Sequence, residues 1–154
     1  MADVTWLTAE QERAWRHYRR MRTLLDLAIS RDLRADSGLS EADYDVLSTL
    51  SEADDDRWRA RDLAAWLSWS TSRLAHHVGR MEARGLVRRD GVADDGRGAT
   101  VVLTAAGRRT LAAAAPPHVA SVRRHLIDLL TPGEIRVLDR IATRVVARLD
   151  GTHE

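Results

Sequence analysis

The sequence predicts a mainly α-helical, α+β protein with a helix-turn-helix pair and a β-hairpin in its middle and long helices toward both ends. Three observations lead to this prediction. Apolar residues recur at helical spacing in both end segments of the chain. A serine-containing break separates two helical segments between residues 61 and 84. Two short β-prone runs then flank a tip that is rich in glycine and aspartate.

The first two helices are defined by their caps. Thr8 and Gln11 have the spacing of a capping box, so a long helix is expected from about residue 9 to the low thirties. Gly38, with the polar residues before it, marks the end of this helix. Ser40 is then expected to cap a second helix, and the acidic run at residues 54–56 is expected to form the exposed loop that follows.

The next two segments form the helix-turn-helix pair. A short helix is predicted from Arg61 to Leu67, and residues 68–70 interrupt it. Ser70 or Thr71 can cap the second helix of the pair, which Gly85 ends. The apolar stripe of this second helix, at helical spacing, consists of Leu74, Val78 and Met81.

A hairpin and two helices complete the predicted order. Residues 86–89 and 99–103 are expected to pair as strands. Thr104 caps the next helix, which the prolines at 116–117 are expected to bend or break. The segment 131–134 combines a threonine cap, a proline and a capping glutamate, and therefore predicts the start of a last helix.

Length and composition limit the function classes. A chain of 154 residues is expected to form a single domain, 1–154. The absence of cysteine excludes disulfides, thiolate nucleophiles, cysteine-ligated zinc and thiol-based redox sensing. No apolar run is long enough to span a bilayer, and the first ten residues lack the pattern of a secretion signal, so we expect no membrane association and a cytoplasmic protein.

The net charge of +1 hides two opposed blocks. Residues 36–56 carry eight acidic residues and no basic one, whereas residues 57–109 carry eleven arginines and five acidic residues. A basic segment inside a nearly neutral chain is typical of a face that meets a polyanion. An ordinary solvated surface is the alternative.

Two motifs in the hairpin are more specific. Asp95-Gly96-Arg97 lies at its tip, and residues 102–107 read Val-Leu-Thr-Ala-Ala-Gly. They resemble the Asp-x-Arg wing tip and the Leu-Thr-x-x-Gly helix start of the winged helix-turn-helix in the MarR family of bacterial transcriptional regulators. The resemblance implies a DNA-binding lobe at residues 40–107 and dimerisation helices at residues 9–34 and 108–150.

This resemblance also implies a function. The chain is expected to be a homodimeric transcriptional regulator that binds a pseudo-palindromic operator in double-stranded DNA, as a repressor that responds to a small-molecule effector. On a helical wheel, three arginines and His77 share one flank of the recognition helix. The predicted DNA-binding residues are Ser70, Thr71, Ser72, Arg73, His76, His77, Arg80, Arg84, Asp95 and Arg97.

Dimerisation is expected for a second reason, because the apolar stripes of the end helices have too few partners within one chain. A monomeric bundle is the alternative. Aromatic residues are predicted to line an effector crevice, although aromatic residues at helical spacing also occur as plain core. This predicted pocket consists of Trp15, Tyr18, Tyr44, Trp66 and His118.

Other function classes are less well supported. The adjacent residues His76 and His77 point about 100° apart on a helix and cannot easily chelate one metal, so neither a metal site nor a cofactor is expected. No phosphate-binding glycine loop or nucleophile motif indicates an enzyme. The remaining alternative is a winged-helix protein-interaction module that does not bind DNA, which the acidic block at residues 36–56 suggests.

Overall fold

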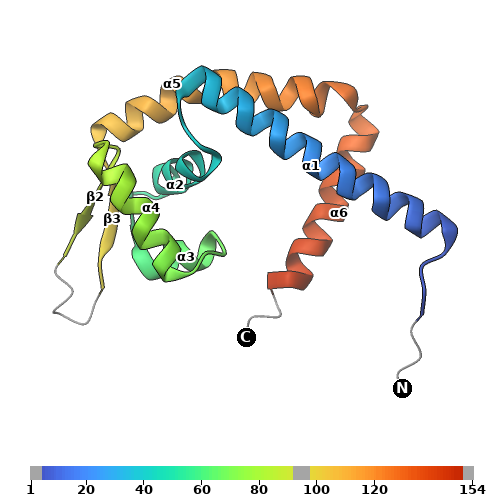
Figure 1. Ribbon diagram of the computed structural model, residues 1–154, viewed down its shortest axis with the longest axis horizontal. Helices are drawn as coiled ribbons and strands as arrows, with labels where there is room; N and C mark the ends of the chain where they lie inside the picture. The colour runs from blue at the N-terminus through green and yellow to red at the C-terminus, as the bar shows by residue number, and fades with distance from the viewer. Residues whose placement is uncertain (1–4, 92–97, 151–154) are drawn as a thin grey trace. The chain divides into compact units, whose positions relative to one another are not determined.

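The computed structural model describes residues 5–91 and 98–150 and confirms the predicted mainly helical fold (Figure 1). The helices are α1 (Ala9–Ser37), α2 (Glu41–Glu52), α3 (Ala60–Trp66), α4 (Thr71–Ala83), α5 (Ala105–His125), the 3₁₀ helix η1 (Ile127–Leu129) and α6 (Pro132–Asp150). The strands are β1 (Arg57–Arg59), β2 (Val87–Asp90) and β3 (Thr100–Leu103).

The chain divides into two units, and α1 and α5 contribute residues to both. One unit comprises Ser30–His118, and the other comprises the segments before and after it. The unit Ser30–His118 contains the predicted lobe, 40–107, and an apolar core formed by its helices and sheet. Buried members of this core include Leu33, Leu39, Val46, Leu47, Leu50, Leu63, Leu74, Val78, Met81, Val87, Val101 and Leu103.

The predicted caps are present. At the start of α2, the Ser40 hydroxyl accepts a hydrogen bond from the Asp43 backbone N–H, and the Asp43 carboxylate accepts one from the Ser40 N–H. Thr131 and Glu134 exchange the equivalent bonds before α6. Gly38 follows α1 with a φ of 71°, a left-handed conformation that glycine adopts without strain.

The sheet contains a strand that the sequence analysis missed. The strand order is β1-β3-β2, with both pairs antiparallel, so β3 is the central strand. In β1, Trp58 pairs with Val101, whereas the predicted hairpin corresponds to β2 and β3. Three residues of Arg-Trp-Arg are too short to show a strand pattern, and their partner lies more than forty residues away in the sequence.

Of the bend or break expected at the proline pair, a break is not present. Helix α5 is continuous from Ala105 to His125, with Pro116 and Pro117 inside it. Each proline removes one backbone N–H from the helical ladder, and the helix continues through both positions. Within residues 5–91 and 98–150, no helix is long and apolar enough to cross a membrane.

Candidate nucleic-acid interface

Three hydroxyl side chains stand at the exposed start of α4. Ser70 is the N-cap, and its Oγ accepts a hydrogen bond of 3.1 Å from the backbone N–H of Arg73. Thr71 and Ser72 follow in the first turn and are exposed. The backbone N–H groups of this turn and the positive end of the helix dipole are suited to bind a phosphate.

The two faces of α4 differ in burial and in side-chain size. The predicted apolar stripe is buried in the core and consists of Leu74, Val78 and Met81. The opposite, exposed face carries short or polar side chains, namely Ser72, Ala75, His76 and Ala83. Gly79 lies between them in the helix, and a Cβ atom there would meet no other atom within 4 Å. A helix with such a face can approach a wide groove closely.

Arg73 is held by an aromatic ring at the edge of this face. Its guanidinium carbon lies 4.2 Å from the centroid of the Trp69 ring, the geometry of a cation–π interaction. Trp69 precedes α4 and also meets the His77 ring edge-on, with the ring centroids 5.4 Å apart. The exposed arginine is therefore connected to a partly buried aromatic pair.

His77 does not lie on the exposed flank that the helical wheel predicts. Its side chain is buried, with Nε2 3.0 Å from Asp43 Oδ1 and Nδ1 2.9 Å from Arg80 Nη2. Burial lowers the pKa of His77, and the Asp43 carboxylate only partly opposes this effect. A helical wheel represents α4 in isolation, so it cannot show that Asp43 of α2 lies against this position.

Asp43 connects α2 to α4 and was not predicted as a site residue. Oδ2 of this carboxylate accepts hydrogen bonds from the Ser40 backbone N–H at 3.0 Å and from Arg84 Nη1 at 2.8 Å. Burial alone would raise the pKa of Asp43, but the hydrogen bonds from Arg84 and Ser40 hold this pKa below its usual value. The aspartate three residues after Ser40 was the available sequence signal.

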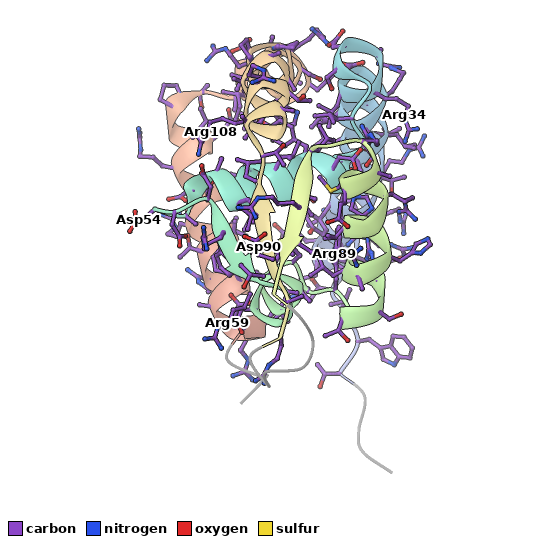
Figure 2. The ribbon with its side chains drawn as sticks, turned by 90° about the vertical axis from the view of Figure 1, so that its left-hand side faces the viewer. Arg34, Asp54, Arg59, Arg89, Asp90 and Arg108 are labelled. Atoms are coloured by element: carbon purple, nitrogen blue, oxygen red, sulfur yellow. The ribbon has the colours of Figure 1, made fainter. Side chains whose placement is uncertain are left out.

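The wing strand β2 is joined to α4 by an ion pair. Glu82 accepts hydrogen bonds from the Arg89 side chain at 2.7 and 2.9 Å and from its backbone N–H at 2.9 Å, and these bonds lower the pKa of Glu82. Figure 2 shows Arg89 on the α4 side of the sheet and Asp54 on the side away from it. The predicted wing-tip residues Asp95 and Arg97 lie outside the described residues.

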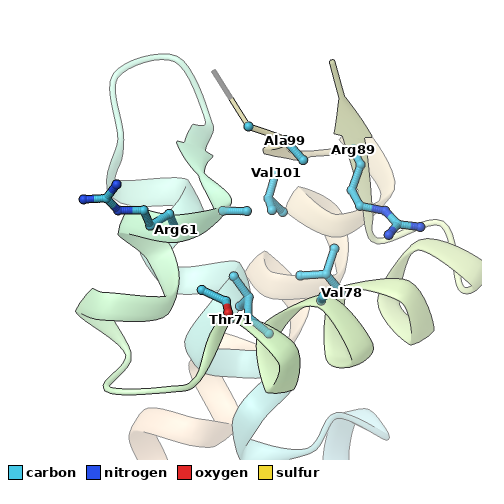
Figure 3. Close-up of a pocket in the computed structure, with 10 residues that line it drawn as sticks. Arg61, Thr71, Val78, Arg89, Ala99 and Val101 are labelled. Carbon is cyan, nitrogen blue, oxygen red and sulfur yellow. The ribbon is translucent and has the colours of Figure 1, made fainter. Parts of the chain in front are cut away.

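A groove of about 300 Å³ separates the first half of α4 from the sheet (Figure 3). Its floor is apolar and includes Val78 of α4 and Val101 of β3. Arg61 and Arg89 flank it, and their guanidinium groups point outward on opposite sides. Arg61 therefore places positive charge on one side of the groove, whereas the charge of Arg89 on the other side is paired with Glu82.

Comparisons with known proteins decide the family. No model of a known protein family and no curated protein matches the sequence. Among solved structures, AbsC, a MarR family transcriptional regulator from Streptomyces coelicolor, is 42% identical with a TM-score of 0.89, over 96% of this chain and 99% of AbsC. The chain belongs to the MarR family.

Two further MarR-fold structures extend this comparison. Sco3205, a MarR family transcriptional regulator from Streptomyces coelicolor solved in complex with DNA, is 38% identical with a TM-score of 0.87, over 96% of this chain and 91% of Sco3205. CouR from Rhodococcus jostii RHA1, solved bound to p-coumaroyl-CoA, shares the fold at 24% identity and a TM-score of 0.68, over 83% of this chain and 87% of CouR. AbsC and Sco3205 are both transcriptional regulators.

The helix-start motif that suggested the MarR family has a physical basis in this structure. The Thr104 hydroxyl lies 2.6 Å from the Gly85 carbonyl oxygen and 2.9 Å from that of Leu86, and it accepts a hydrogen bond from the Gly107 N–H at 2.9 Å. A Cβ atom at Gly107 would lie 2.0 Å from the Leu86 carbonyl oxygen. Only glycine allows α5 to begin this close to the end of α4.

The residues predicted for an effector pocket form separate aromatic pairs in this MarR chain. Tyr44 and His118 have ring centroids 4.3 Å apart. Trp66 is 66% exposed and pairs with Trp58 at 5.8 Å. In the other unit, the exposed residues Trp15 and Tyr18 stack on each other at 5.7 Å. Among the described residues, no group of three or more potential metal ligands is present.

Proposed function

We propose that this MarR-family chain is a sequence-specific DNA-binding regulator that inserts α4 into the major groove. The observation that carries the proposal is the exposed face of α4, which begins with a capped turn and is flanked by arginines. A helix of this kind fits the major groove, where arginine can donate two hydrogen bonds to guanine. The DNA complex of the 38% identical relative Sco3205 supports the same use of the fold.

The predicted contact residues take different roles in this proposal. Arg73 and Arg80 are the candidates for base contacts, and the hydroxyl groups at residues 70–72 are candidates for phosphate contacts together with the first turn of α4. Arg84 donates to Asp43, and His77 is buried, so neither is assigned a base contact. Arg97 stays the proposed minor-groove contact of the wing tip, oriented by Asp95.

The regulator acts as a homodimer in this proposal. In α6, no residue is buried, although Ile141 and Val145 recur at helical spacing and are 51% and 50% exposed. A row of apolar side chains on a long helix is costly to leave in water, and a second copy of the same helix can cover it. Two α4 helices related by a two-fold axis would then read a pseudo-palindromic operator about one DNA turn apart.

Repression with release by a small-molecule effector completes the proposal. Tyr44 and His118 are the aromatic pair of the predicted pocket that lies within the DNA-binding unit, and they connect α2 to α5. An effector that inserts against this pair would change the support on which α4 rests, because α2 also carries Asp43. A cell-based reporter driven by the operator distinguishes a repressor from an activator.

The test is fluorescence anisotropy with DNA fragments taken from upstream of the chain's own coding region, compared with a random duplex at several salt concentrations. Arg73→Ala or Arg80→Ala should cost about 1–3 kcal/mol on the operator and less on random DNA. Arg97→Ala should weaken both and lower the salt slope by about one per lost contact per subunit. Arg13→Ala, at an exposed arginine on α1 outside the basic block, is the matched control and should have no effect.

Failure to bind any genomic DNA would contradict the proposal. In that case, the alternative of a winged-helix protein-interaction module would account for the acidic block at residues 36–56 better.

A further inference from the structure

We propose that His77 is a positioning residue for DNA recognition, which holds the guanidinium of Arg80 at the edge of the exposed face of α4, and that Asp43 in turn holds His77. The inference rests on the proposed function, in which α4 enters the major groove. It adds a buried imidazole to the residues that determine how well the operator is distinguished from other DNA.

The contacts define one protonation form of the imidazole. Nδ1 lies 2.9 Å from Arg80 Nη2, and because the guanidinium can only donate, Nδ1 must accept. The proton of the neutral ring is therefore on Nε2, which lies 3.0 Å from Asp43 Oδ1. At this distance the carboxylate attracts the ring electrostatically, although the pair lacks the angles of a hydrogen bond. His77 is 7% exposed, whereas Arg80 is exposed, so a buried side chain anchors a side chain on the surface.

An anchored arginine recognises DNA better than a free one. Arginine has several rotatable bonds, and immobilising it on binding costs side-chain entropy. The hydrogen bond to His77 orders the guanidinium before DNA arrives and leaves its other N–H groups available. Arg73 is ordered by the Trp69 ring, which also contacts His77, so a variant that keeps a ring at position 77 is needed to test Arg80 without disturbing Arg73.

Protonation of His77 would remove this anchor. The groups that face the ring are Asp43 from α2, Trp69 before α4, and Arg73 and Arg80 from α4 itself. Burial lowers the pKa of His77, Asp43 opposes the shift, and the two arginines add to it, so the neutral form prevails at neutral pH. A protonated ring carries hydrogen on Nδ1, cannot accept from Arg80, and repels it.

The first experiment is a double-mutant cycle in which operator and random duplexes are titrated by anisotropy. His77→Phe keeps a ring against Trp69 but lacks the acceptor, so operator affinity should fall about three- to tenfold, with little change on the random duplex. In the Arg80→Ala background, the same substitution should have no further effect. In the Arg73→Ala background, the full three- to tenfold loss should persist.

A second pair of variants covers the case that His77→Phe does not fold. His77→Asn places an amide oxygen near the position of Nδ1 and can accept from Arg80, whereas His77→Gln places its amide near Nε2 and reaches only Asp43. Operator affinity should be retained in His77→Asn and lost in His77→Gln. His17→Asn, an exposed histidine on α1, is the control.

The pH profile supplies a readout that a purely structural role would not change. The ratio of operator affinity to random-duplex affinity should fall for the wild type as the pH drops through the pKa of His77, which burial holds below its usual value, and should stay level for His77→Asn. Additive losses in the Arg80 cycle, equal affinities of the Asn and Gln variants, or parallel pH profiles would each overturn the inference. If the wild type bound no DNA at all, the proposed function itself would fail and this inference with it.

Discussion

Replacing Gly79 with alanine should make the protein more stable and a worse DNA binder. Glycine within a helix is about 0.5–1 kcal/mol less favourable than alanine. At this position, an added Cβ would meet no other atom within 4 Å, so no packing loss offsets the gain. For a chain of this size, the expected rise in the melting temperature is about 2–4 °C per kcal/mol.

The same substitution should weaken operator binding. The added methyl group lies next to the exposed face of α4, and in a closely packed interface an extra methyl typically costs about 1–3 kcal/mol. Operator affinity should therefore fall by about 5- to 150-fold. Thermal unfolding followed by circular dichroism and anisotropy titration of the operator measure the two effects on the same sample.

Gly133→Ala is the matched control. Gly133 lies in the first turn of α6, and a Cβ there would make only ordinary contacts of 3.9 Å with Arg136 and Thr131. This variant should be stabilised while operator affinity stays unchanged. Wild-type affinity in Gly79→Ala would refute the argument that the glycine permits close approach to DNA, and a lower melting temperature would refute the claim of free space.

Three further predictions concern stability and assembly. Gly107→Ala should destabilise the protein by several kcal/mol in chemical unfolding, because its Cβ would overlap the Leu86 carbonyl oxygen; a small loss would contradict the required close approach. Ile141→Asp should convert a light-scattering dimer into a monomer at micromolar concentration and weaken operator binding, and an unchanged mass would exclude α6 from the interface. The free energy of unfolding should decrease as the pH falls from about 7 to 5, because burial keeps the folded-state pKa of His77 below 6.5 and the unfolded chain therefore takes up a proton before the folded chain does. A flat profile over this range in His77→Phe identifies the histidine contribution. Below about pH 3.8, protonation of Asp43, whose folded-state pKa is lowered, should reduce stability further.

Local sequence patterns predicted the helices because each cap or stop residue lies within a few residues of the helix end that it defines. Ser40 and Thr131 sit next to the backbone groups they cap, and glycine at position 38 follows directly from the end of α1. These signals act over one helical turn, so no knowledge of the rest of the chain is required. Caps and apolar stripes therefore gave most of the element order.

Features that depend on distant contacts were not predicted. Strand β1 exists because β3 pairs with it, and its three residues carry no periodicity of their own. His77 has the spacing of a surface residue on α4, but Asp43 of α2 draws its ring into the interior. The sequence therefore predicted the recognition helix and its basic flank. The buried contact of Asp43 with His77 behind that flank is seen only in the three-dimensional structure.

The contacts of Thr104 couple the position of α4 to the orientation of α5. Its hydroxyl and the close approach of Gly107 to Leu86 fasten the start of α5 to the end of α4, and α5 then continues out of the DNA-binding unit. A helix of 21 residues is about 30 Å long, so a tilt of about 5° displaces one end relative to the other by about 3 Å. A displacement of this size is comparable to the length of a hydrogen bond. In the proposed complex with DNA, a slight tilt of α5 would therefore be enough to move the arginine donors of α4 out of register with the base edges.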